Sequence, residues 1–366
     1  MAMSGSGVGD RGVDRVATGG RWRRWGSRLL AALLAVCGVW CFGAVYFDGP
    51  WPGTGNLVLA LVWATVFLGA WLRPPARLLG GRGRRFGRRW PALALLLVVM
   101  APWAMIQPSN ERDWQPEFGR TGHGEVGDDG TVTLHEVRNF EWKSRDEAVE
   151  RWETRSFRLD KLRGVDLVFD AFMGDVLAHP MLSFDFGEDG RVVLSAETRR
   201  EVGESFSALG GFYKMFELQY LFGDERDFIR LRTNIRRQPV YLYRLRGDLG
   251  MWREFFLTTV DEMNQLREEP AFYNVITHNC TTSLYALLPA EDRGRWDWRV
   301  LVNGRLDELL WRRGVLASGQ TWSDFDSFRE LSRINQRAQE ADDAPDFSER
   351  IRHGVPGFHG ASGVEP

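Results

Sequence analysis

Three apolar runs within the first 106 residues constrain the fold more than any other feature of the sequence. They cover residues 29–47, 56–72 and 90–106, and none of them contains Lys, Arg, Asp or Glu. A helix that crosses a bilayer needs about 20 such residues, and flanking Trp side chains suit the membrane interface. We therefore expect a cytoplasmic segment at 1–28 and a three-helix membrane anchor at 29–106. A cleaved signal peptide is the alternative for the first run, but no clear A-x-A-like cleavage site precedes Tyr46.

The distribution of charge predicts how this anchor is oriented. Residues 1–106 carry 13 arginines and 3 acidic residues, whereas the remaining 260 carry 34 basic and 46 acidic residues. Arginines precede the first run and fill the link at 73–89, while the link at 48–55 has no basic residue. Basic residues mark the cytoplasmic side, so the N-terminus is expected in the cytoplasm and the main domain in the periplasm of a bacterial inner membrane. An acidic soluble part excludes a typical nucleic-acid binder.

The residues after the anchor predict an α+β domain. We expect a linker at 107–130, the domain at 131–340 and a weakly ordered tail at 341–366. Residues 144–157 are expected to be irregular or briefly helical. Strands are predicted at 165–172, at 180–186 and 191–197 around a Gly/Asp turn, and as a pair at 228–232 and 240–244. Apolar spacing predicts helices at 249–266, from about residue 280, and near 305–313 and 325–335.

Cys280 is the residue on which a functional interpretation depends. Cys37 and Cys41 lie inside the first apolar run and are expected to pack there, so Cys280 is the single cysteine of the outer domain. It precedes two Thr and a run with helical spacing, which predicts a position at a helix N-terminus. There the helix dipole favours a thiolate, and backbone N–H groups can stabilise an oxyanion. A buried cysteine that only packs is the alternative.

A nucleophilic cysteine also needs a base, and two histidines qualify. His278 is two residues before Cys280, whereas His179 begins the predicted hairpin. We favour His179, because a nucleophile and its base usually come from different elements. The basic stretch at 224–237 could meet phosphate headgroups, but a solvated strand face with local ion pairs is the preferred interpretation. Scattered His and one Cys give no metal-ligand spacing, so no metal or cofactor is expected.

Five blocks of sequence resemble one known family. They read VRNFEW (137–142), AHPMLSFDF (178–186), LSAETRRE (194–201), DERDFIRLRTN (224–234) and YNVITHNCTT (273–282). Together they are similar to the Lnb-type periplasmic domain, a family that includes lipoprotein N-acylation transacylases. The resemblance covers most of the chain from about residue 131. It implies a permuted papain-like (NlpC/P60-like) cysteine enzyme, in which the strand histidine precedes the helix cysteine.

The resemblance also implies roles for individual residues. Cys280 would be the nucleophile, His179 the base, and a polar group on the neighbouring strand would orient the imidazole. Glu197 and Ser195 are the candidates for that group, while a surface ion pair is the alternative for Glu197. The implied activity is acyl transfer on lipoproteins or lipids through a thioester, with a membrane phospholipid or lipoprotein as substrate. The alternatives are a cell-envelope cysteine peptidase or amidase and an inert scaffold.

Overall fold

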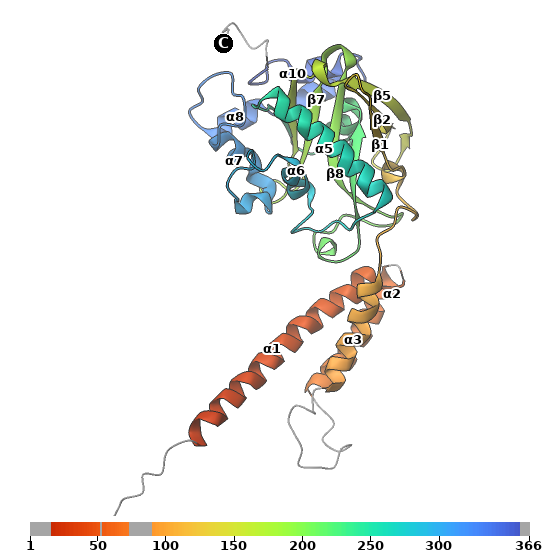
Figure 1. The fold of residues 1–366 in the computed structure, drawn as a ribbon, viewed down its shortest axis with the longest axis vertical. Coiled ribbons are helices and arrows are strands. Elements are labelled where there is room, and N and C mark those ends of the chain that lie inside the picture. The colour runs from red at the N-terminus through yellow and green to blue at the C-terminus, as the bar shows by residue number, and fades with distance from the viewer. Residues whose placement is uncertain (1–15, 52, 73–89, 359–366) are drawn as a thin grey trace, which may run out of the picture. The chain divides into compact units, whose positions relative to one another are not determined.

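The chain divides into a helical N-terminal unit and a larger α+β unit. A computed structural model describes residues 16–51, 53–72 and 90–358. The units are Met1–Ile106 and Gln107–Pro366. Figure 1 shows the helices of the first unit and the sheet and helices of the second.

The three apolar runs are helical. Helix α1 spans Val16–Asp48, α2 spans Thr54–Leu72 and α3 spans Trp90–Met105. Two segments, Arg28–Asp48 and Thr54–Leu72, are long and apolar enough to cross a membrane, whereas α3 has only 16 residues. Of the three predicted membrane spans, two are therefore supported. The Arg-rich link lies largely outside the described residues.

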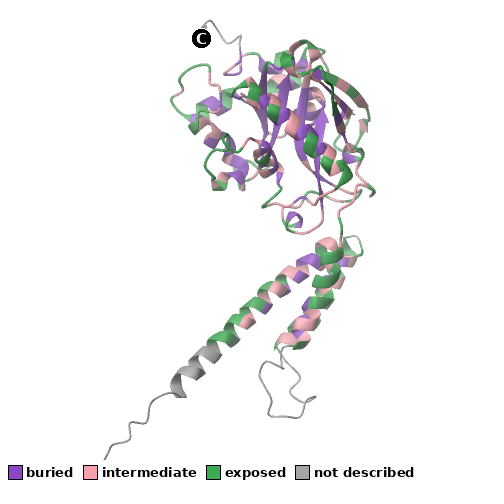
Figure 2. Cartoon of the chain, viewed as in Figure 1, coloured by how far each residue is buried: buried purple, intermediate pink, exposed green. Residues whose placement is uncertain are grey.

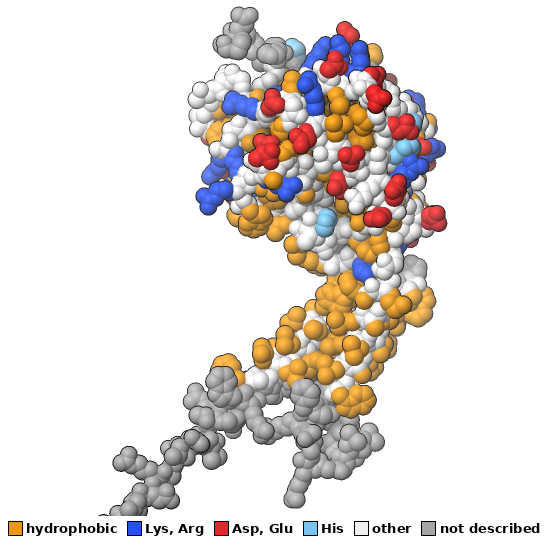
Figure 3. Space-filling view, in the orientation of Figure 1, with side chains coloured by type: hydrophobic (Ala, Val, Ile, Leu, Met, Phe, Trp, Pro, Cys, Tyr) orange, Lys and Arg blue, Asp and Glu red, His pale blue; other side chains and the backbone are white. Residues whose placement is uncertain are grey.

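Most of the helical unit's surface is apolar. A small core forms between the helices from Leu34, Cys41, Phe67, Ala92 and Leu96. Many other large apolar side chains of these helices are exposed, and Figure 3 shows them covering the described surface of the unit. Water would penalise a surface of this kind, whereas a hydrocarbon environment would not.

A mixed eight-stranded sheet forms the centre of the second unit. Its order is β1-β2-β9-β8-β7-β6-β10, and β5 also pairs with β2. Neighbouring strands are antiparallel except β2 and β9. The bounds are β1 His123–Val126, β2 Thr131–Arg138, β5 Trp152–Arg158, β6 Gly164–Asp170, β7 His179–Asp185, β8 Arg191–Arg199, β9 Glu217–Gly223 and β10 Val240–Arg244. A separate hairpin joins β3 Glu141–Trp142 to β4 Ala148–Val149.

Helices cover both faces of this sheet, which is why its central strands are buried along most of their length (Figure 2). On one face lie α5 Leu249–Glu268, α6 Cys280–Leu287, α7 Leu306–Arg312 and α8 Phe325–Leu331. On the other lie α4 Glu225–Arg230, α9 Asn335–Ala341 and α10 Phe347–Arg352. Side chains of one strand alternate between these two cores: Leu167 and Phe169 face α5, whereas Val168 faces α9 and α10. The α+β class and the strands β6, β7, β8 and β10 are thus confirmed.

The predicted strand at 228–232 is wrong. Helix α4 and a π-helix at Leu231–Ile235 occupy this segment instead. Asp224 caps α4, since its side chain accepts a hydrogen bond of 3.0 Å from the Arg226 N–H. Phe228 and Ile229, consecutive residues of α4, are both buried in the core on this face of the sheet.

Other segments are more ordered than expected. Residues 152–158, predicted irregular or helical, form β5, and the predicted linker at 107–130 contains β1. Within that linker Trp114 packs 4.3 Å from the Arg199 guanidinium carbon. In the predicted tail, α10 buries its apolar side chains in the second core. Each segment carries a few bulky apolar residues without a clear period, and these find burial only in the tertiary structure.

Candidate active site

The β7–β8 hairpin brings His179 beside two polar side chains. The Nε2 atom of His179 lies 2.7 Å from Ser195 Oγ and 3.2 Å from Glu197 Oε1. Ser195 Oγ donates a hydrogen bond of 2.7 Å to the same carboxylate oxygen. Ser195 and Glu197 are two residues apart on β8 and therefore share one face of the strand. Both groups that the sequence offered for orienting the imidazole thus contact it.

The charge of this cluster is set by the His179–Glu197 pair. Burial by itself lowers the pKa of His179, but the Glu197 carboxylate and hydrogen bonds with Cys280 and Glu197 raise the pKa to about 9. Burial by itself raises the pKa of Glu197, but His179 and Arg232 hold this pKa well below its ordinary value. At neutral pH the pair is therefore imidazolium and carboxylate.

Cys280 is the first residue of α6, as the sequence predicted. Asn279 is the N-cap, and its Oδ1 accepts hydrogen bonds of 2.8 Å from the N–H groups of Thr281 and Thr282. The Thr282 hydroxyl oxygen in turn accepts from the Asn279 N–H, which completes a capping box. The cap fixes the direction in which the helix starts, and the partly exposed thiol of Cys280 lies in a cavity.

The same cap reduces the number of backbone donors available to an oxyanion. The amides of Thr281 and Thr282 are both occupied by Asn279, which leaves the Cys280 N–H. Tyr273, a buried residue that lines the cavity, lies beside Cys280. Burial and the nearby Cys280 raise the pKa of Tyr273, so its hydroxyl keeps a proton that it can donate. Backbone N–H groups near Cys280 stay the predicted oxyanion donors, and among them the Cys280 N–H is the one that Asn279 leaves available, with the Tyr273 hydroxyl as a further candidate.

His179 and Cys280 line one cavity of about 270 Å³, whereas His278 does not. The His278 side chain is exposed, and its Nδ1 lies 2.8 Å from Thr277 Oγ1. Since Nε2 of His179 is occupied by Ser195 and Glu197, Nδ1 is the nitrogen left to face Cys280. The remaining lining includes apolar Phe172, Leu177, Phe206, Val275 and Leu301 and basic Arg200, Arg232 and Arg236.

Asn303 links the histidine strand to the cysteine helix, and sequence reasoning missed it. Its Oδ1 accepts from the Ala178 N–H at 2.8 Å, and its Nδ2 donates to the Ala178 carbonyl at 2.7 Å and to Thr281 Oγ1 at 2.6 Å. Nδ2 also lies 3.8 Å from Cys280 Sγ. Both protons of this amide are engaged by oxygens, so Asn303 positions the site and has no free proton for substrate.

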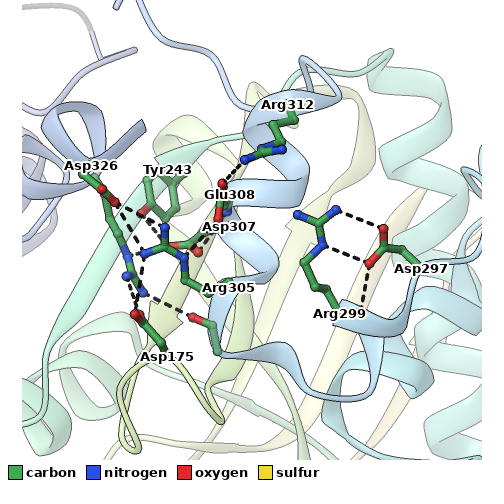
Figure 4. Close-up of polar contacts among 11 residues, drawn as sticks. Asp175, Tyr243, Asp297, Arg299, Arg305, Asp307, Glu308, Arg312 and Asp326 are labelled. Atoms are coloured by element: carbon green, nitrogen blue, oxygen red, sulfur yellow. Dashed lines mark hydrogen bonds and ion pairs between the residues drawn. The ribbon is translucent and has the colours of Figure 1, made fainter. Parts of the chain in front are cut away.

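An ion-pair network holds the segment that carries Asn303 against the loop that precedes His179 (Figure 4). Asp175 of that loop accepts a hydrogen bond of 2.9 Å from Arg329 and lies 3.7 Å from Arg305. Arg329 also pairs with buried Asp307 at 2.8 Å, and Asp307 accepts from the Tyr243 hydroxyl. The loop and the Asn303 segment are thereby fixed to each other.

A possible metal-ligand cluster lies on other strands. His123, Glu125 and His135 on β1 and β2 each offer one ligand atom, and these atoms lie within 4.8 Å of one another. None of the three lines the Cys280 cavity.

Comparison with known proteins agrees with the sequence resemblance. Residues 148–304 match the family model described as the Lnb N-terminal periplasmic domain. The matched segment contains His179, Glu197, Cys280 and Asn303. Neither a curated protein nor a solved structure matches the chain. The family and the apolar N-terminal helices fit an inner-membrane protein with a periplasmic domain.

Proposed function

From the match of residues 148–304 to the Lnb N-terminal periplasmic domain, we propose that this chain is a membrane-anchored cysteine acyltransferase that acts on lipoproteins or lipids. One observation carries the proposal: a cysteine at a helix N-terminus shares a cavity with a histidine that is paired with a carboxylate whose side chain is only 13% exposed. This is the constellation of an activated nucleophile, its acid–base partner and an orienting group.

The proposed reaction has two balanced steps. The Cys280 thiolate attacks the carbonyl carbon of an acyl ester, the C–O bond breaks, and the His179 imidazolium gives its proton to the departing alcohol oxygen. The thioester is then attacked by an amine, whose proton passes to His179 as the C–S bond breaks. The Cys280 amide and the Tyr273 hydroxyl would stabilise the oxyanion in both steps.

Glu197 and Ser195 act in this reaction through the imidazole of His179. The carboxylate keeps His179 protonated until a leaving group needs the proton, and the hydrogen bonds at Nε2 direct Nδ1 toward Cys280. A thiolate beside an imidazolium and a helix N-terminus is nucleophilic at neutral pH.

Apolar surface around the cavity supports an acyl substrate over a peptide. Phe206 and Leu301 line it, and the Val275 N–H hydrogen-bonds the Gly211 carbonyl, which places the loops at 209–212 and 275–277 side by side. Leu209, Phe212 and Ile276 on these loops are exposed. Exposed apolar residues beside a reactive thiol suit an acyl chain. A peptidase or amidase with the same residues is the second candidate, since acyl transfer and amide hydrolysis need the same groups.

We propose, as part of this function, a permuted papain-like arrangement and the topology predicted from charge. The strand histidine precedes the helix cysteine in sequence, and α6 lies on the sheet beside β7 and β8. The N-terminus would be cytoplasmic, three helices would span the inner membrane, and the substrate would be a membrane phospholipid or lipoprotein. Tethering keeps the enzyme at the surface where acyl chains reside.

The test is to trap the acyl-enzyme on full-length protein in membranes. An activated lipid-like acyl ester is expected to leave a thioester on Cys280, detected by mass spectrometry. Cys280→Ala should abolish the adduct and His179→Ala should slow its formation. Cys37→Ala/Cys41→Ala is the matched control, because these thiols lie in α1 and should not matter. If wild type gives no adduct and Cys280 is also inert to small thiol reagents, the acyltransferase proposal is overturned. The catalytically inert scaffold is then the remaining interpretation. An adduct that forms from a peptide substrate instead would favour the peptidase.

A further inference from the structure

Three arginines line the cavity that holds Cys280. Arg200 follows the last residue of β8, Arg232 lies within the π-helix, and Arg236 ends that helix. Arg232 and Arg236 belong to the segment 224–237, for which local ion pairs were expected, and that expectation is wrong. Its acids pair elsewhere: Asp224 with Arg155, Glu225 with Arg352 and Asp227 with Arg138. The arginines are therefore not neutralised by their neighbours in sequence.

Of the three, Arg232 alone is well compensated. Its Nε lies 3.2 Å from Asp170 Oδ2, and its Nη2 lies 3.4 Å from Glu197 Oε1. Among the described residues, Arg200 makes a long ion-pair contact of 3.5 Å with Glu117 and lies 4.9 Å from the centre of the Phe118 ring, and its Nε is buried without a hydrogen-bond partner. The Arg236 guanidinium makes no ion pair or side-chain hydrogen bond with any of residues 16–51, 53–72 and 90–358.

The acids that line the cavity, Asp170 and Glu197, both contact Arg232, so Arg200 and Arg236 have no directly paired carboxylate among its lining residues. Burial lowers the pKa of Arg236 to about 10, and the neighbouring Arg232 and Arg200 add to the effect. Holding a partly buried guanidinium without an anion costs free energy, and a bound anion would remove that cost. Two guanidinium forks beside a nucleophile are the donors that phosphate esters require.

A second cavity continues from these arginines. It has a volume of about 650 Å³ and shares Arg200, Phe206 and Arg236 with the first. Its lining is rich in acids, namely Glu117, Asp146, Glu147, Glu150 and Glu204. The first cavity holds the thiol, the two shared arginines lie at both cavities, and carboxylates line the second. This arrangement matches a ligand with an ester, an anion and a terminal ammonium group.

We propose that Arg200 and Arg236 bind the phosphodiester of a glycerophospholipid acyl donor, with its acyl ester at Cys280 and a headgroup amine in the acidic cavity. The proposal rests on the proposed function and names its donor. In such a lipid the phosphate and the acyl esters are attached to one glycerol, so an ester at Cys280 would bring the phosphate near the arginines that line the same cavity. When the ester C–O bond breaks, a lysophospholipid leaves with the proton from His179, and the acyl group stays on Cys280.

The experiment compares acyl donors on the full chain in detergent micelles. Phosphatidylethanolamine, the diacylglycerol with the same chains and an uncharged activated ester are supplied separately, and the acyl adduct on Cys280 is followed by mass spectrometry. We expect wild type to prefer the phospholipid over diacylglycerol by about 10- to 100-fold, the range of charge-assisted hydrogen bonds. Arg236→Gln should bring this ratio close to one, and Arg200→Gln should lower it. Arg237→Gln is the matched control, because Arg237 is exposed and does not line the cavity.

The outcomes distinguish a failure of the phosphate subsite from a failure of the proposed acyltransferase function. An unchanged ratio in Arg236→Gln and Arg200→Gln overturns the phosphate subsite. If Arg236→Gln unfolds, wild type is tested with soluble glycerophosphoethanolamine, which should slow acylation by the uncharged ester; no slowing overturns the subsite. Equal slowing by inorganic phosphate, without a preference for the phospholipid, indicates a free-phosphate site and overturns the lipid assignment. A preference for phosphatidylglycerol overturns the amine assignment. No adduct from any donor is a failure of the proposed function itself.

Discussion

Asn303 holds the backbone of Ala178 at both of its polar groups, accepting from the N–H at 2.8 Å and donating to the carbonyl at 2.7 Å. Ala178 immediately precedes His179, and the same Asn303 amide donates to the hydroxyl of Thr281, which immediately follows Cys280. A single side chain therefore sets the spacing between base and nucleophile.

Asn303→Ala should show that Asn303 acts by positioning His179 and Cys280. We expect the rate of Cys280 acylation to fall by about 100-fold, because small displacements of reacting groups are costly. The free energy of unfolding should fall by only about 1–3 kcal/mol for the lost buried hydrogen bonds. Acylation and thermal unfolding are measured on the same preparation. Asn303→Asp keeps the acceptor and loses both donors, so it should behave like Asn303→Ala; wild-type rates in both variants would refute a positioning role.

Glu197→Gln should change the pH dependence of the rate of Cys280 acylation. The pKa of His179 is raised to about 9, with the Glu197 carboxylate as the largest effect that opposes burial. Any folding stability that the raised pKa of His179 adds is fully present below the ordinary histidine pKa of about 6.5 and is lost as pH rises through about 9. The imidazolium that partners the thiolate is lost as pH rises through the same value of about 9. Without the carboxylate the pKa of His179 falls, so the alkaline limb of the rate of Cys280 acylation by an ester, which needs the imidazolium proton for the departing alcohol, should move to lower pH.

The matched comparison for that profile is Ser195→Ala, which removes a hydrogen bond at His179 Nε2 but leaves the charge of Glu197 in place. Its alkaline limb should shift less than that of Glu197→Gln. Identical profiles for wild type and Glu197→Gln would show that the carboxylate does not control the histidine.

The hairpin and the cysteine helix could be predicted because their signals are local. Strand alternation around a Gly/Asp turn fixed β7 and β8, and Asn279 with Thr282 at capping-box spacing marks the start of α6. The pairing of His179 with Glu197 needed only the correct register between two adjacent strands. Such features lie within a few residues of one another in sequence, where pattern and propensity are informative.

Asn303 and Arg236 could not be predicted in the same way. Asn303 lies in a short 3-10 turn with no periodic pattern, and its partners are 22 and 125 residues away. The acids that precede Arg236 predict a solvated face with local ion pairs. In the helix that forms instead, those acids pair with arginines that are distant in sequence. Long-range partners of charged side chains leave no local trace in a single sequence.

Arg352 ties the C-terminal helix to the sheet, so its removal should lower stability. Its guanidinium pairs with Asp166 at 2.7 Å and with Glu225, and all three side chains are buried. Breaking a buried pair from one side costs about 3–5 kcal/mol. Arg352→Leu should therefore lower the unfolding free energy by roughly that amount in denaturant titrations. Arg350→Leu is the control, since Arg350 pairs with Asp346 at the surface.

The same pair predicts a pH effect. Burial by itself raises the pKa of Glu225, but Arg352 outweighs it and holds the pKa at about 2. The stability from this depressed pKa is present above the unfolded value of about 4.3 and is lost as pH falls through about 2. In Arg352→Leu the pKa of Glu225 should rise, so acid unfolding should begin at higher pH than in wild type. Acid midpoints that coincide would contradict the pairing.

Gly304→Ala should disturb the active site without touching a catalytic group. A Cβ at Gly304 would meet the carbonyl carbon of Asp175 at 2.1 Å, and this contact is with backbone that cannot rotate away. The loop that carries Asp175 leads into His179, so its displacement should slow Cys280 acylation by at least about 10-fold. Gly119→Ala is the matched control, because its nearest contact would be 3.4 Å and its φ of −63° suits alanine. Equal acylation rates for the two variants would show that the close approach of Gly304 to this loop does not hold the histidine in place.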